Sequence, residues 1–347
     1  MLLASTLMGL VIAEMAARGF DLSKTWTSYV GQDLRPALTV TREPVGFTRL
    51  PSTRWPMPLG KTFASNSLGF RDGEFVRDKR PGRSRIAFLG DSVTEGYGVE
   101  VAERYCEVTR DRLEASSPGS WETLGFGVIA HSTADELVVL ERHVLAYTPD
   151  LVVVQFGFND IALNTQKLSL VAGGPPGTDP PQPRRPAGFK AFLQRHSALY
   201  LAVAERASLL RLKQGGHSAI LDALLETRPE DWAATRELLT RLFALCRARR
   251  IPVLVTYLPL DVEVQVRSEK ESEHVSKALR EICAASVGVS FVDVLPTLRK
   301  NRERDLFLDD VHPTPLGHRI IGEELAKAIA QLKVRPSGES RTTVGVS

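Results

Sequence analysis

The chain has 347 residues, of which 43% are hydrophobic and 24% are charged, and its formal net charge is +3. This composition is that of an ordinary globular protein and excludes a disordered or collagen-like chain. The charge is too small to predict binding to nucleic acid. Three cysteines cannot form a complete disulfide framework, and we interpret Cys106, Cys246 and Cys283 as buried thiols.

Residues 2–17 are almost wholly apolar, and Glu14 is their only charged residue. The segment is slightly shorter than the roughly 20 residues that a spanning helix needs. We expect an uncleaved membrane anchor over residues 1–20, with a packed amphipathic helix or a cleaved signal peptide as alternatives. We expect the main domain of the anchored protein to lie outside the cytoplasm. Arg18 and Lys24 oppose that orientation, so a cytoplasmic location is the alternative.

Residues 21–84 lack sustained periodicity and contain several prolines, so we expect an irregular extension of loops and short strands. Apolar runs then alternate with amphipathic stretches. Strands are predicted at 85–90, 121–126, 151–156, 251–257 and 289–292. Helices are predicted at 101–115, 134–147, 269–287 and 316–332. This alternation predicts an α/β fold, a three-layer α/β/α sandwich with a doubly wound, five-stranded parallel sheet.

We expect this domain to span residues 85–333 and to be followed by a flexible tail over 334–347. A long insertion, 161–250, separates the third and fourth strands. It is predicted to contain a Pro/Gly-rich loop at 173–186 and helical stretches at 189–212, 219–226 and 231–249. Doubly wound folds bind ligands near the carboxyl ends of their strands. The insertion is therefore expected to form a lid or substrate wall, or else to serve packing alone.

Gly90-Asp91-Ser92 follows the first predicted strand, at the sheet edge where active sites collect. A serine hydroxyl becomes a nucleophile when a base removes its proton. Near the C-terminus, Asp309-Asp310-Val311-His312-Pro313 supplies a histidine with two candidate carboxylate partners, Asp309 and Asp310. Each segment alone is also compatible with an ordinary turn or an acid-rich surface loop.

Two further segments follow predicted strands. Asn159, in Gly157-Phe158-Asn159-Asp160, carries an amide that can donate to an oxyanion. Gly127, in Gly125-Phe126-Gly127, allows a backbone N–H to approach a ligand closely. His131 is expected either to line the site or to cap the next helix. A metal site is disfavoured, because His318 is spaced to face away from Asp309, Asp310 and His312, and no cofactor is expected.

Taken together, the four segments resemble the SGNH hydrolases, also called the GDSL esterase/lipase family. The matching residues are Gly90-Asp91-Ser92-Val93, Gly127, Gly157-x-Asn159-Asp160 and Asp309-x-x-His312-Pro313. The resemblance implies a flavodoxin-like sandwich with Ser92 as nucleophile, His312 as base and Asp309 as the acid that orients it. It also implies an oxyanion hole made by the N–H groups of Ser92 and Gly127 and the side chain of Asn159.

The segment Asn66-Ser67-Leu68-Gly69-Phe70-Arg71 is similar to one found in membrane-anchored bacterial members of that family, and we expect it to pack beside the site. Two departures affect the expected shape of the pocket. Gly125 stands where the family often has asparagine, and Ile129-Ala130-His131 replaces a commoner glycine-aromatic pair.

The resemblance implies a serine esterase that acts on a small ester, such as an O-acetyl group on a carbohydrate or lipid-linked molecule. An O-acyltransferase that uses the same triad is the alternative. A non-catalytic binding module at a membrane, associated through residues 2–17, is a weaker interpretation. A phosphate-binding protein is disfavoured, because the loop at Ser92 lacks a glycine-rich cradle.

Overall fold

The computed structural model describes residues 2–19, 45–56, 62–171, 229–265 and 274–332, and single residues at 197, 199, 200, 203 and 334. The chain divides into two compact units. One comprises Met1–Thr39 and Pro175–Glu226, and the other comprises Val40–Gly174 and Thr227–Ser347. The second unit contains the sheet and the candidate catalytic residues Ser92, Asp309 and His312.

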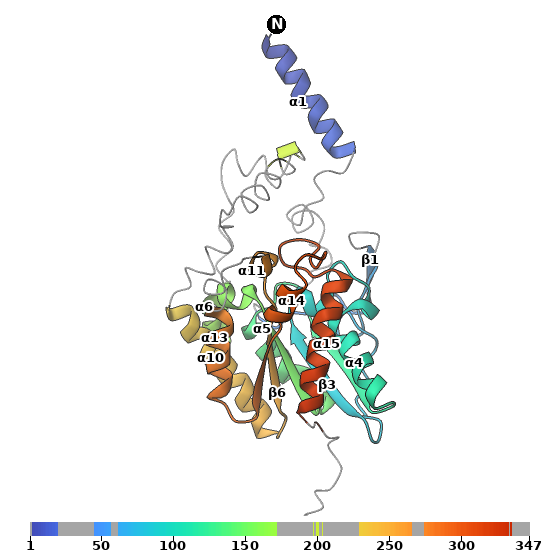
Figure 1. Ribbon diagram of the computed structural model, residues 1–347, viewed down its shortest axis with the longest axis vertical. Coiled ribbons are helices and arrows are strands. Elements are labelled where there is room, and N and C mark those ends of the chain that lie inside the picture. The colour runs from blue at the N-terminus through green and yellow to red at the C-terminus, as the bar shows by residue number, and fades with distance from the viewer. Residues whose placement is uncertain are drawn as a thin grey trace, which may run out of the picture. The chain divides into compact units, whose positions relative to one another are not determined.

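A five-stranded parallel sheet forms the centre of the second unit (Figure 1). Its strand order is β4-β3-β5-β6-β7. The strands are β3 (Ser84–Gly90), β4 (Trp121–Gly127), β5 (Leu151–Phe156), β6 (Val253–Tyr257) and β7 (Val289–Asp293). Every residue of β3, β5 and β6 is buried, as expected for strands covered on both faces. The predicted doubly wound α/β/α sandwich is confirmed.

Helices cover both faces of the sheet (Figure 1). The longer ones are α4 (Tyr105–Ser116), α5 (Thr133–Arg142), α6 (Phe158–Val171), α10 (Pro229–Ala248), α13 (His274–Ala284) and α15 (Pro315–Gln331). Helices α4 and α15 pack on each other over Ile86 and Phe88, in a core that also includes Val153. Helices α5, α6 and α10 pack together. Ala87 of β3 points to the opposite face of the sheet from Ile86 and Phe88, because successive side chains of a strand point to opposite faces.

Several element boundaries differ from those predicted. The fourth strand begins at Val253 rather than residue 251, since Pro252 has no N–H for the ladder. The helix predicted at 134–147 ends at Arg142 and is followed by the 3-10 turn η3 (Val144–Tyr147). The helix predicted at 269–287 ends at Ala284, three residues early. The predicted loop 173–186 and helices 189–212 and 219–226 lie outside the described residues, apart from the few single positions.

The N-terminal extension contains an antiparallel hairpin of β1 (Arg54–Pro56) and β2 (Thr62–Ala64). The described part of the second unit also contains the shorter elements α3 (Ser92–Glu95), η2 (Val101–Glu103), α11 (Asp261–Gln265) and α14 (Leu295–Lys300). In the first unit, α1 (Leu2–Gly19) carries an ion pair between Arg18 Nε and Glu14 Oε1 at 2.8 Å. Across the described ranges, we find no helix with the length and apolarity needed to cross a membrane.

Candidate active site

Ser92 begins α3, directly after the carboxyl end of β3. Asp91 caps this helix, because its Oδ1 accepts a hydrogen bond from the backbone N–H of Val93 at 2.8 Å. A Cβ added at Gly90 would lie 2.1 Å from the hydroxyl of Thr94, so only glycine fits at the corner. The chain thus makes a tight turn that places Ser92 at the carboxyl edge of the sheet, where such folds bind ligands.

His312, on the loop before α15, approaches Ser92 from the other end of the sequence. Its Nε2 lies 2.9 Å from Ser92 Oγ, and its ring lies 4.4 Å from that of Tyr97, centroid to centroid. The loop is held by Leu308, whose N–H donates to the His312 carbonyl at 2.7 Å, and by Thr314, which caps α15. The imidazole is therefore fixed in place before a substrate binds.

Asp309 holds the opposite side of that ring. Its Oδ2 lies 2.8 Å from His312 Nδ1, while its Oδ1 accepts from the backbone N–H groups of Val311 and His312. Burial raises the pKa of Asp309, but the hydrogen bonds from His312 outweigh burial and bring the pKa below its ordinary value. With a proton on Nδ1 donated to this carboxylate, Nε2 is free of its own proton and can accept the one on Ser92.

Asp310, the rival partner of His312, has a different environment. Its backbone carbonyl accepts a hydrogen bond from the N–H of Asp261 at 3.0 Å. Burial and the neighbouring carboxylates of Asp309 and Asp261 raise the pKa of its carboxyl. Of the two acids, Asp309 makes the contacts with Nδ1 of His312.

Gly127 ends β4 and Asn159 follows β5, the two strands that flank β3. Asn159 is in the first turn of α6, and its Nδ2 donates to Oδ2 of Asp91 at 3.0 Å. Gly127 ends β4 and pairs in register with Gly90. A Cβ on Gly127 would lie 2.3 Å from the backbone nitrogen of Glu95, so the glycine allows β4 and α3 to pack closely. The fold brings both residues to the edge that holds Ser92.

Two buried carboxyl groups, Asp160 and Glu136, lie on the helices that begin near this edge. Asp160 accepts hydrogen bonds from the N–H of Gly157 at 2.7 Å and from the N–H and hydroxyl of Thr133, each at 2.6 Å. These bonds join the start of α6 to the start of α5, although burial raises the pKa of Asp160 to about 7. Burial, together with Asp160 and Asp91, also raises the pKa of Glu136 well above its ordinary value.

Both interpretations of His131 are wrong. The residue is fully buried, and its Nε2 lies 2.8 Å from the carbonyl oxygen of Phe47. The helix is capped by Ser132, which forms a capping box with Asp135. His131 thus joins the N-terminal extension to the turn before α5 instead of lining the site or capping the helix.

His318 is fully buried and contacts α4. Its Nδ1 accepts a hydrogen bond from the N–H of Tyr105 at 3.2 Å, and burial lowers its pKa to about 3. This is the environment of a neutral structural imidazole. Within the described ranges there is no group of three His, Cys, Asp or Glu residues arranged to hold a metal.

Three residues near the site were not identified from the sequence. Gln155 accepts hydrogen bonds from Asp91 N–H and the Thr94 hydroxyl, each at 3.0 Å. A polar residue in the apolar run of β5 was an available signal, because buried polar groups need partners. The others are Tyr97, which packs on His312, and Arg49 of the extension. Arg71 belongs to the segment 66–71 that was expected to pack beside the site, and it contacts the carbonyls of Glu95 and Gly96.

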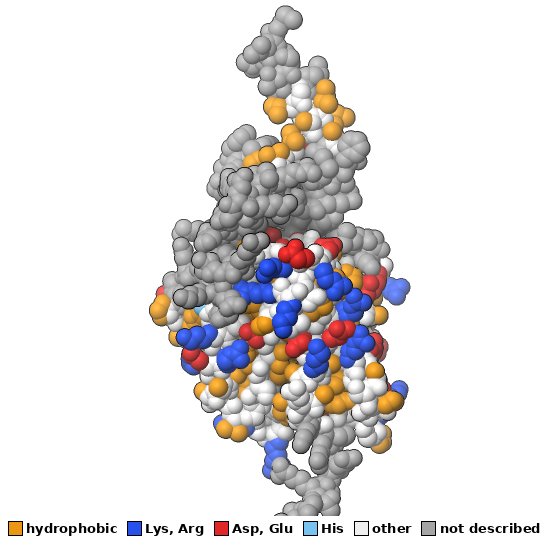
Figure 2. All heavy atoms as spheres, in the orientation of Figure 1, with side chains coloured by type: hydrophobic (Ala, Val, Ile, Leu, Met, Phe, Trp, Pro, Cys, Tyr) orange, Lys and Arg blue, Asp and Glu red, His pale blue; other side chains and the backbone are white. Residues whose placement is uncertain are grey.

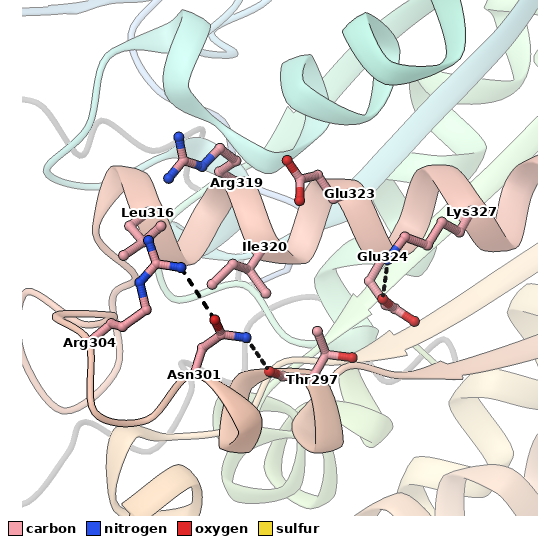
Figure 3. Close-up of a pocket in the computed structure, with 9 residues that line it drawn as sticks. All are labelled: Thr297, Asn301, Arg304, Leu316, Arg319, Ile320, Glu323, Glu324 and Lys327. Atoms are coloured by element: carbon pink, nitrogen blue, oxygen red, sulfur yellow. Dashed lines mark hydrogen bonds and ion pairs between the residues drawn. The ribbon is translucent and has the colours of Figure 1, made fainter. Parts of the chain in front are cut away.

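A groove of about 400 Å³ lies between α14 and α15, and its lining includes none of the catalytic candidates (Figure 3). Its lining comprises Thr297, Asn301, Arg304, Leu316, Arg319, Ile320, Glu323, Glu324 and Lys327. Charges of both signs line it and several are paired, including Lys327 with Glu324 at 3.3 Å. It contains no nucleophile with an adjacent base.

Residues 88–320 match the GDSL-like lipase/acylhydrolase family. The chain therefore belongs to this family and is an ester hydrolase of the serine type. No curated protein sequence matches it.

Three solved structures illustrate the similarity. The acetyl xylan esterase AlAXEase is 16% identical, with a TM-score of 0.45 over 71% of this chain and 99% of its own. The hydrolase LAE5 from the Lake Arreo metagenome is 17% identical, with a TM-score of 0.45 over 72% and 96%. A lipase/acylhydrolase from Enterococcus faecalis is 17% identical, with a TM-score of 0.45 over 73% and 100%.

Proposed function

We propose that this protein hydrolyses small carboxylic esters, such as an O-acetyl group on a carbohydrate, through an acyl-serine intermediate on Ser92. The observation that carries the proposal is the continuous line of contacts from Ser92 Oγ to His312 Nε2 at 2.9 Å and from His312 Nδ1 to Asp309 Oδ2 at 2.8 Å. A nucleophile, a base and an orienting acid in hydrogen-bond contact are the arrangement that activates a serine.

In the proposed reaction, Ser92 Oγ attacks the ester carbonyl carbon while His312 Nε2 takes the hydroxyl proton. The oxyanion is stabilised by the N–H groups of Ser92 and Gly127 and by the amide of Asn159. Collapse of the intermediate breaks the bond to the alcohol, which leaves with the proton from His312. Water then attacks the acyl-serine, again with His312 as base, and releases the acid and free Ser92.

The proposal is tested by the steady-state hydrolysis of p-nitrophenyl acetate and a panel of acetylated sugars. The wild-type protein is expected to turn over both, and Ser92→Ala is expected to lose turnover with an unchanged circular dichroism spectrum. Turnover retained by Ser92→Ala would exclude this nucleophile. Adding alcohols and sugars as acyl acceptors distinguishes the transferase alternative, because a transferase forms a new ester at the expense of free acetate.

We also propose that residues 2–17 associate with a membrane. Support comes from α1, where Leu10, Val11, Ile12 and Met15 are each more than half exposed, and apolar side chains are visible on this helix in Figure 2. Exposed contiguous apolar surface marks interaction sites. The test is flotation of the full chain with liposomes, compared with a chain that lacks residues 1–20. Equal flotation of the two would contradict the proposal.

A further inference from the structure

The position of Ser92, the first residue of α3, depends on what holds the C-terminal end of that helix at Glu95 and Gly96. Helix α3 has four residues, and a helix this short does not persist without tertiary contacts. The Ser92 carbonyl accepts hydrogen bonds from the N–H groups of Gly96 and Tyr97 at 3.0 and 2.9 Å. Whatever holds Glu95 and Gly96 therefore also holds the nucleophile.

Arg49 holds the side chain of Glu95. Its Nε and Nη2 donate to the two carboxylate oxygens at 2.7 Å each, and both side chains are only 2% exposed. Such a bidentate pair fixes direction as well as distance. The link joins residues that lie 46 positions apart in the sequence.

Arg71 holds the backbone at the same end of α3. Its Nη1 donates to the carbonyls of Glu95, at 3.2 Å, and of Gly96, and its Nη2 donates to the carbonyl of Val99 at 2.7 Å. Carbonyls at a helix C-terminus lack intrahelical partners, and a buried cation satisfies them. The backbone that follows the nucleophile is thus tied down at three points.

The fold of the extension presents both arginines. Asn66 Oδ1 accepts from the N–H groups of Leu68 and Phe70, each at 3.0 Å, and so shapes the turn that leads to Arg71. The buried Phe63 ring lies 5.1 Å from the guanidinium carbon of Arg49 and 5.7 Å from that of Arg71. Cation–π contacts of this kind restrict where a guanidinium can lie.

We propose that Arg49 and Arg71, which we call the arginine clamp, are positioning residues for Ser92. The proposal rests on the proposed function, since it assigns a role to contacts around its nucleophile. The arginine clamp lies outside residues 88–320, the part of the chain that matches the family. The N-terminal extension is accordingly a working part of the active site.

The contact between Gly127 and Glu95 connects the arginine clamp to the proposed oxyanion hole. Because Gly127 packs directly on the backbone of Glu95, the position of α3 also sets the distance between Ser92 and the Gly127 N–H. Both groups would act on the reacting carbonyl. Loosening α3 is therefore expected to lower kcat more than it raises KM, since misplacement of about 1 Å can cost about 100-fold in rate.

Arg71→Lys tests this proposal, with Arg85→Lys as the matched control. Arg85 is equally buried and also donates to backbone carbonyls, those of Arg77 and Tyr147. It lies at the opposite end of β3, about 20 Å along the chain from Ser92. We expect both variants to lower Tm, but only Arg71→Lys to lower kcat, by about 10- to 100-fold, with KM within about threefold.

The double variant Arg49→Met with Glu95→Gln removes the buried ion pair without leaving a lone charge, so it guards against a failure to fold. We expect it to fold and to show the same selective loss of kcat. Wild-type kcat in both folded variants, or an equal loss in Arg85→Lys, would overturn the proposal. Ser92→Ala separates failure of the proposed function from failure of the clamp proposal. Turnover by Ser92→Ala would contradict the proposed function. An inactive Ser92→Ala together with wild-type kcat in the clamp variants would contradict only the positioning role of the arginine clamp.

Discussion

Asn159 Nδ2 donates a hydrogen bond to Oδ2 of Asp91 at 3.0 Å, so the residue before the proposed nucleophile orients the amide of the proposed oxyanion hole. The same carboxylate caps α3 through its other oxygen. One buried side chain thereby fixes the relation between Ser92 and Asn159. An oxyanion donor is effective when its direction is set before the reaction, because no reorganisation is then needed in the transition state.

Asn159→Ala is expected to lower kcat by about two to three orders of magnitude, the usual loss for one oxyanion donor. KM should change little, because the donor acts most strongly on the transition state. Stopped or steady-state assays on p-nitrophenyl acetate measure both constants. A variant with normal kcat would remove Asn159 from the oxyanion hole.

Asp91→Asn should lower kcat by about tenfold or more while the protein remains folded. Asparagine fills the same space but offers one acceptor oxygen, so it cannot serve both the Val93 N–H and the Asn159 amide. Burial raises the pKa of Asp91, so the neutral substitute is compatible with its surroundings. An unchanged kcat would show that Asn159 is oriented by other groups.

Asp309 and Asp310 are adjacent, so their asparagine variants form a matched pair that tests which acid orients His312. Asp309→Asn should lower kcat by two to four orders of magnitude, because an amide at this position leaves the imidazole in the wrong tautomer. Asp310→Asn should stay within about threefold of wild type, since it is Asp309 that contacts Nδ1. Reversal of this order in kcat would assign the orienting role to Asp310.

The stability of the protein should depend on His318 at acid pH. The folded pKa of about 3 lies below the ordinary value of 6.5, so the unfolded state binds one more proton between these values. The free energy of unfolding should therefore fall as the pH falls below 6.5, by up to about 1.4 kcal/mol per pH unit from this group.

Urea unfolding of wild type and His318→Asn at several pH values checks this slope. At pH 8 both side chains are neutral, so the difference there measures the loss of packing and of the contact with Tyr105 alone. The variant should show the shallower decline between pH 6.5 and 4. Parallel curves over that range would contradict a neutral His318.

Local patterns of hydrophobicity in the sequence were sufficient to predict most strands of the sheet. The run Leu151–Phe156 predicts β5 with its observed ends, because a short apolar stretch between turn residues has few other ways to bury itself. The fourth strand was predicted two residues too long at its start, where Pro252 cannot donate to the ladder. The end of a strand depends on which residues can donate backbone hydrogen bonds, and a hydrophobic pattern carries no information about this.

The groups that hold the site in place depend on contacts between segments that are distant in the sequence, and these contacts could not be predicted. The pairing of Arg49 with Glu95 has no periodic signature, and a charged residue in an irregular extension resembles a solvated one until its partner is known. His131 illustrates the converse, since its sequence position suggested the site while its partner is the carbonyl of Phe47. The motif residues could be predicted as a set and the segment 66–71 could be placed beside them, whereas the individual contacts that hold them could not be predicted.

The central claim, that Ser92 is the nucleophile, is tested most directly by intact-mass measurement after treatment with a fluorophosphonate probe. Such a probe forms a covalent bond with an activated serine hydroxyl and not with an ordinary one. The wild-type protein should gain the mass of one adduct, which peptide mapping should place on Ser92, and Ser92→Ala should gain none. An adduct on another residue, or labelling of Ser92→Ala to the wild-type extent, would contradict the assignment.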